Sequence, residues 1–240
     1  FVNQGADLLS NAGIAYALEA AQTEKHLFSV ISGGNSRYKS GSHVDVKGVN
    51  LLAGASTKLP NSSGNLLLTG FFEAGWGNYD SFNSFADGDV KGSGDNRYYG
   101  AGILARQDFS NKFYTEGSIR AGKLENEFNA TVSGKATHYK LHNAYYAAHL
   151  GAGYLMPLGT GELDMYGKYL WTRQNGGKHT IAGDVFTFDD INSQRSKLGA
   201  RYCHPLNYFI SFFLCAGWED EGAGEANASV HGLPIAAPSL

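Results

Sequence analysis

Apolar residues alternate with glycine or polar residues along six separate stretches of this chain. From Leu66 to Trp76 every second residue is apolar or small, whereas Glu73 and Gly75 fall on the opposite side. A period of two places successive side chains on opposite faces of a β-strand. The alternation recurs over residues 99–108, 113–122, 146–156, 163–172 and 208–219. The sequence therefore predicts an all-β fold whose strands have one apolar face and one small or polar face.

The second face distinguishes between two all-β architectures. The polar face of a soluble β-sandwich meets bulk water and is rich in charged residues and threonine. Here it is rich in glycine, and the chain has 32 glycines against 5 prolines. Small residues with sparse charges favour a confined, wet interior. Aromatic residues lie near the ends of the apolar faces, as in membrane-interface girdles: Phe72, Trp76, Tyr146, Tyr154, Tyr169, Trp171, Tyr208 and Trp218. The pattern favours a transmembrane antiparallel up-and-down β-barrel, and a soluble β-sandwich adhesin or binding domain is the alternative.

The connections between strands fall into short and long classes that alternate along the chain. Long polar segments are expected at 79–96, 125–143 and 175–193, and short turns at 59–64, 110–112, 158–161 and 204–207. Outer-membrane barrels show this asymmetry, with short periplasmic turns and long extracellular loops. About ten strands are expected, over residues 27–38, 44–58, 65–77, 97–108, 113–128, 141–156, 161–174, 186–202, 208–221 and 225–235.

Residues 3–22 differ from the rest because they are rich in alanine and leucine, free of proline and nearly free of β-branched residues. This composition predicts one helix of about 18 residues, roughly 27 Å long and close to the thickness of a bilayer core. Its small side chains suit a helix inside a narrow, glycine-lined pore. An amphipathic helix lying on a sheet is the alternative.

Several function classes are excluded. The net charge of −3 and the lack of a basic run argue against nucleic-acid binding. The apolar stretch at 208–218 is too short for a membrane-spanning helix. We find no enzyme motif, and expect no catalytic residue, cofactor or metal. A less favoured alternative is a barrel-form hydrolase using His179, Asp189, Asp190 and Ser193 in one long loop. Cys203 and Cys215 lack metal or redox spacing, and the sequence assigns them no role.

Five segments carry a resemblance to a known family: QGADLL at 4–9, RYKSGSHVDVKGVNLLAG at 37–54, FFEAGWG at 71–77, RYYGAG at 97–102 and LDMYGKYLW at 163–171. In this order after one helix, they resemble the translocator β-domain of bacterial autotransporters, the type V secretion proteins of Gram-negative outer membranes. The resemblance implies a barrel of about twelve strands with a helix in its lumen, joined to an N-terminal passenger carried to the cell surface. It also implies the outer-membrane bilayer and the barrel-assembly machinery as partners.

The domain organisation follows from this resemblance. We expect a linker and pore-spanning helix over residues 1–25 and an outer-membrane barrel over residues 26–240 that lacks about two C-terminal strands. The pore-helix candidates are Asp7, Leu8, Leu9, Asn11, Tyr16 and Leu18. Strand parity assigns to the lumen Glu73, Arg106, Glu116, Arg120, His149, Gly151, Gly153, Lys168, Lys197 and Arg201. Opposite charges there are expected to pair across strands, hydrate the pore and hold the helix.

Overall fold

The computed structural model describes residues 2–39, 43–85, 88–132, 135–181, 184–205, 211–223, 227–230 and 233–236. The chain begins with a helical segment made of α1 (Val2–Leu8), a π-helical turn η1 (Leu9–Gly13) and α2 (Ile14–Ala20). The predicted helix is thus confirmed, with a π turn that the sequence pattern did not reveal. None of the helices among the described residues is long and apolar enough to cross a membrane.

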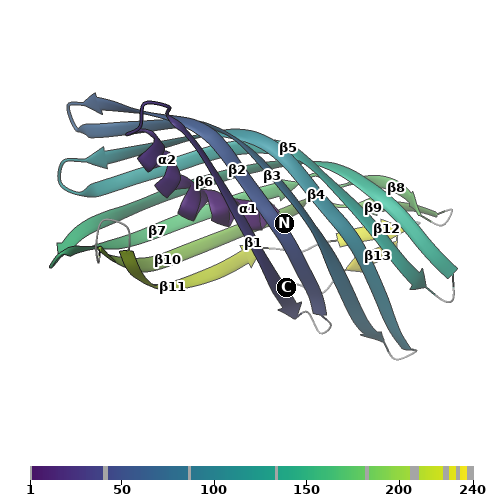
Figure 1. The fold of residues 1–240 in the computed structure, drawn as a ribbon. Coiled ribbons are helices and arrows are strands. Elements are labelled where there is room, and N and C mark those ends of the chain that lie inside the picture. The colour runs from purple at the N-terminus through teal and green to yellow at the C-terminus, as the bar shows by residue number, and fades with distance from the viewer. Residues whose placement is uncertain are drawn as a thin grey trace.

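An antiparallel sheet of nine strands follows, and its order is that of the chain. It comprises β1 (Leu27–Lys39), β2 (His43–Asn61), β3 (Gly64–Phe85), β4 (Gly88–Phe109), β5 (Phe113–Val132), β6 (Lys135–Leu158), β7 (Gly161–Gln174), β10 (Ile191–Pro205) and β11 (Ser211–Ala223). The sheet curls around the helical segment (Figure 1). Among the described residues β1 and β11 are its two edges and do not pair with each other.

A second sheet of four short strands lies beyond one end of the first. It contains β8 (Gly177–Ile181), β9 (Asp184–Phe188), β12 (Asn227–Val230) and β13 (Leu233–Ala236) in the order β13-β12-β9-β8. Two expectations are corrected here. The strand expected at 186–202 is interrupted, because residues 189 and 190 separate β9 from β10. The strand expected at 225–235 is a hairpin of the second sheet rather than a tenth strand of the first.

The long loops expected from the sequence are mostly strand. β3 and β4 stay paired as far as Phe85 and Gly88, and β5 and β6 as far as Val132 and Lys135. Segment 175–193 contains the β8–β9 hairpin. The loop assignment was wrong because these segments carry few apolar side chains, so backbone pairing continues without the apolar alternation that reveals a strand. Short turns at 62–63, 110–112 and 159–160 agree with expectation. The turn at 204–207, and Tyr208 and Ile210 of the expected ninth strand, extend outside the described residues.

The two faces of the large sheet have different environments. Large apolar side chains on the convex face are exposed, including Ile103 at 60% and Leu150 at 66%. On the concave face Leu52, Leu67, Phe71 and Leu104 pack with Leu8, Leu9, Ile14 and Ala17 of the helical segment. One curled sheet with an apolar outside and a helix inside confirms the barrel-like fold class rather than a sandwich.

Candidate functional site on the concave face

Strand register aligns the concave-face residues into cross-strand rows. One row runs from Leu67 on β3 through Arg106, Glu116, Gly151 and Lys168 to Lys197 on β10. Because opposed residues lie about 5 Å apart, charges in such a row interact across neighbouring strands. The register thus brings five of the sequence-predicted residues together.

The carboxylate of Glu116 is the centre of the first charged cluster. It has no exposed side-chain surface and lies 3.0 Å from Lys168 Nζ, 3.2 Å from Arg106 Nη1 and 3.3 Å from His149 Nε2. The Arg106 guanidinium also lies 3.6 Å from the centre of the Tyr114 ring, a cation–π contact. A buried carboxylate needs such partners, since an unpaired charge in the interior is costly.

A second cluster lies farther along the strands. Glu73 accepts hydrogen bonds of 2.6 Å from Arg120 Nη1 and from the Tyr145 hydroxyl, and Glu73 and Arg120 are almost fully buried. Arg120 Nη2 donates to the backbone oxygen of Val2 at 3.0 Å. This cluster therefore connects the wall of the sheet to the first turn of the helix.

The remaining lumen candidates lie on the same face. Arg201 Nη2 is 3.2 Å from Asp164 Oδ2, and Asp164 also accepts a hydrogen bond from the Tyr114 hydroxyl at 2.8 Å. Gly153 lies beside Tyr114, where a Cβ would approach the ring to 2.5 Å. Gly151 likewise leaves space for a neighbour, because a Cβ there would lie 3.0 Å from Glu116 Cγ.

Asp7 is the main charged contact from the helical segment to the wall. It accepts hydrogen bonds from Arg195 Nη1 at 3.0 Å and Lys197 Nζ at 2.8 Å. One turn earlier, Asn3 Nδ2 donates to Ser193 Oγ at 3.0 Å. Lys168 Nζ donates to the backbone oxygen of Ser10. Side chains of β7 and β10 therefore hold successive turns of the helix.

Small residues allow the helix to approach the wall closely. A Cβ at Gly13 would lie 2.5 Å from Leu52 Cδ2, and one at Gly5 would overlap the Tyr98 hydroxyl. Of the other helix candidates, Leu8 and Leu9 are buried in the core, and Leu18 is partly buried against it. Asn11 and Tyr16 are exposed.

A cavity of about 360 Å³ lies between the helical segment and the wall, lined by residues that include Ser10, Ile14, Glu116, Asp164 and Lys168. The Ser10 hydroxyl is buried without a hydrogen-bond partner among the described residues. A cavity of this size, with charged side chains among its mainly apolar walls, has room for water molecules that satisfy buried polar groups.

Sequence reasoning missed Arg195 and Tyr98 as site residues. Arg195 shares strand parity with Lys197 and Arg201, so the same argument would have identified it. The side chains considered for a hydrolase have separate partners. Ser193 contacts Asn3 and Glu221, whereas Asp190 contacts Arg173 and the Gly176 amide. Among the described residues, no group of three or more His, Cys, Asp or Glu side chains is arranged to hold a metal ion.

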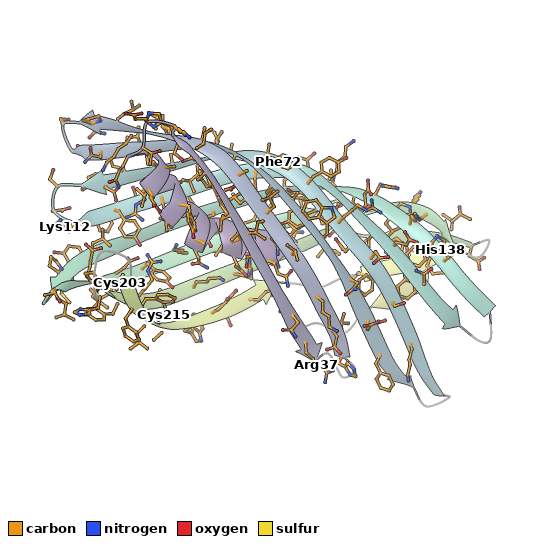
Figure 2. The ribbon with its side chains drawn as sticks, viewed as in Figure 1. Arg37, Phe72, Lys112, His138, Cys203 and Cys215 are labelled. Atoms are coloured by element: carbon orange, nitrogen blue, oxygen red, sulfur yellow. The ribbon has the colours of Figure 1, made fainter. Side chains whose placement is uncertain are left out.

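The two ends of the large sheet are distinct. Figure 2 shows Lys112, Cys203 and Cys215 at the end with the short turns, and Arg37 and His138 at the opposite end, where the strands are extended. Both cysteines are exposed and unbonded.

Comparison with known proteins agrees with this geometry. The β domain of the Bordetella autotransporter BrkA is similar in fold, with 13% identity, a TM-score of 0.63 and coverage of 85% of each chain. The translocator domain of the autotransporter NalP from Neisseria meningitidis has 17% identity and a TM-score of 0.67, and the match covers 98% of this chain and 82% of that one. The transport unit of the autotransporter AIDA-I from Escherichia coli has 15% identity and a TM-score of 0.66, and the match covers 95% of this chain and 80% of that one.

No curated protein matches the chain. The family model described as the autotransporter beta-domain matches residues 28–237, which is most of the sequence. The chain therefore belongs to the autotransporter β-domain family, whose members are β-barrel anchors of the outer membrane.

Proposed function

We propose that this domain anchors a covalently attached N-terminal passenger in the outer membrane and passes it through the barrel to the cell surface. The observation that carries the proposal is the position of the helical segment on the concave face. Arg120, Lys168, Arg195 and Lys197 reach it from β5, β7 and β10. A helix held in this way joins the passenger to the anchor through the lumen.

The domain divides, in this proposal, into a linker and pore-spanning helix at residues 1–25 and a barrel at residues 26–240. The lumen wall comprises Glu73, Arg106, Glu116, Arg120, His149, Gly151, Gly153, Lys168, Lys197 and Arg201. Its ion pairs balance most of the buried charge, and its remaining donors bind the helix backbone and Asp7. The proposed work of the domain is conduction and anchoring.

The barrel-assembly machinery of the outer membrane is the proposed insertion partner. The apolar convex face supports this partner, because a sheet with this exterior requires help to reach the membrane without aggregating. Depletion of the machinery is expected to leave the barrel unfolded in the periplasm, with no passenger at the surface.

Surface display tests the function directly. In intact cells carrying the full protein, external protease should remove the passenger, while the barrel stays protected and migrates differently on gels before and after boiling. A folded, membrane-inserted barrel whose passenger remains in the periplasm would contradict the proposal.

The position of the helix is tested by a thiol cross-linker. Asp7→Cys combined with Lys197→Cys, in a Cys203→Ser and Cys215→Ser background, should be joined by a short bis-maleimide, whose spacer replaces the length of the lysine side chain that now reaches Asp7. Tyr16→Cys with Lys197→Cys is the control, because Tyr16 is exposed and lies nine residues after Asp7, about 13 Å farther along the helical segment. Equal cross-linking of both pairs would count against a fixed helix.

A further inference from the structure

The contacts of the helix show the direction in which the preceding polypeptide leaves the lumen. Along β10, the helix contacts Lys197 and Arg195 through Asp7, and then Ser193 through Asn3. Lower helix numbers thus lie nearer the extended ends of the strands. At the helix N-terminus, Val2 packs with Tyr98, Leu124 and Tyr145. The N-terminus of the helix at Val2 therefore points toward the extended ends of β3 to β6.

Three aromatic rings form a row on this exit path. Phe128 lies on the same face of β5 as Leu124, four residues farther along, which corresponds to about 13 Å. Its ring centre is 6.4 Å from that of Tyr79 on β3 and 5.1 Å from that of Tyr139 on β6. These three residues are called the aromatic row. Gly94 lies between Tyr79 and Phe128 in the register.

Two asparagine side chains lie between the helix end and the aromatic row. Asn96 and Asn126 are directly opposed on β4 and β5. The Tyr79 hydroxyl donates to Asn126 Oδ1 at 3.0 Å, which orients that amide. Asn96 Oδ1 is buried and has no hydrogen-bond partner among the described residues. The pair thus places amide groups, which complement a peptide backbone, between the helix end and the aromatic row.

Charged side chains of the same strand ends point to the other face. Arg97 pairs with Glu125 at 3.3 Å, and Lys140 with Glu127 at 2.7 Å, all at positions with convex-face parity. Among the described side chains of β3 to β6, the concave face at this end therefore carries rings and amides rather than charges. Such a surface suits an extended polypeptide of any sequence, because stacking and backbone hydrogen bonds do not select side chains.

We propose that Asn96, Asn126 and the aromatic row bind the extended segment of passenger that directly precedes Val2 as it leaves the lumen. This inference rests on the proposed function and adds a contact surface to it. At about 3.3 Å per residue, the segment three to five residues before Val2 lies over the aromatic row.

Site-specific photo-cross-linking tests the contact. The photoreactive amino acid p-benzoylphenylalanine is placed at Phe128 in the full protein, with its passenger attached, and cross-links are mapped by mass spectrometry. The matched control carries it at Phe82, which has convex-face parity at the end of β3 and stacks on His43. Cross-links from position 128 to the segment three to five residues before Val2, with none from position 82, are expected. A surface-displayed passenger without cross-links from position 128 would overturn the inference and leave the proposed function intact.

Export kinetics provide a second readout. Phe128→Ala should slow the appearance of passenger at the surface about threefold, the order of effect expected from losing one aromatic contact. Phe82→Ala should leave the rate unchanged. Heat-modifiable migration of both variants checks that each barrel folds. Equal rates for the two folded variants would overturn the inference, whereas a complete absence of export in the native protein would overturn the proposed function instead.

Discussion

Gly153 shows how a missing side chain positions a neighbouring ring. A Cβ there would lie 2.5 Å from Tyr114 Cζ and 2.7 Å from the Met165 backbone oxygen. Gly153→Ala should therefore displace Tyr114, weaken its hydrogen bond to Asp164, and lower the free energy of unfolding by about 1–3 kcal/mol. Denaturant unfolding in lipid vesicles measures the change.

Gly70 is the matched control because it lies on the convex face of β3, and no other atom lies within 4 Å of the position of its Cβ. Gly70→Ala should be neutral or slightly stabilising, since alanine loses less backbone entropy on folding. Equal destabilisation by both changes would show that Tyr114 is not held in place by this close fit.

The buried pair of Glu73 and Arg120 leads to a second prediction. Arg120→Met leaves the Glu73 carboxylate buried with Tyr145 as its remaining hydrogen-bond donor. Removing one partner of a buried pair costs about 3–5 kcal/mol, so the unfolding midpoint in denaturant should fall sharply.

Arg37→Met is the comparison for this change. Arg37 forms a salt bridge with Asp45 at 2.6 Å, but its side chain is more than half exposed. Because solvent screens exposed pairs, little change in the free energy of unfolding is expected. A small effect of Arg120→Met would mean that water replaces the lost guanidinium.

At the scale of elements, apolar patterning predicts strands where one face is continuously apolar and fails where apolar side chains are few. β7 begins and ends at the expected residues, 161–174, because Leu163, Met165, Tyr169 and Trp171 mark its convex face. The ends of β3 and β4 were missed, since residues 77–96 carry few apolar side chains and pair through their backbones. Local pattern could not predict the partners of Asp7 either, because Asp7 and Lys197 are 190 residues apart in the sequence and only the curl of the sheet brings them together.

The ion pair between Glu127 and Lys140, in the polar extension of the β5–β6 hairpin, is expected to depend on pH. The Lys140 ammonium lies 2.7 Å from Glu127 and holds the pKa of that carboxyl below its usual range. Because the pKa of Glu127 is lower in the folded state than in the unfolded chain, the ion pair stabilises the folded state at any pH above the ordinary pKa of glutamate. This stabilisation is lost as the pH falls through the pKa of Glu127 in the folded state. Because solvent screens this exposed pair, its contribution to stability is small, and we expect the pH dependence in the titration of Glu127 itself.

The variant Lys140→Met tests the cause. It should raise the titration midpoint of Glu127, observed by carbon NMR of a selectively labelled sample, toward the ordinary value of about 4.3. An unchanged midpoint would mean that Lys140 is not the group that lowers this pKa.

For the molecule as a whole, the family fold and the two unlike strand ends define an orientation in the membrane. Short turns face the periplasm in outer-membrane barrels, and long hairpins face outward. The convex apolar band, with Phe72 and Trp76 exposed in the middle part of β3 and Phe113 at the turn end of β5, lies between them. The helix then enters from the periplasmic side at α2 and points its N-terminus outward, as the export of an N-terminal passenger requires.

The native thiols provide the test of this orientation. Cys203 and Cys215 are exposed near the short turns, whereas His138 is exposed at the extended end (Figure 2). A polyethylene-glycol maleimide too large to cross the outer membrane should label the native protein only after the membrane is permeabilised. The variant Cys203→Ser, Cys215→Ser, His138→Cys should be labelled in intact cells, because its single thiol faces outward. The reverse result, with native cysteines labelled in intact cells, would place the short turns at the cell surface and leave the helix pointing its N-terminus into the periplasm, where no passenger reaches the exterior.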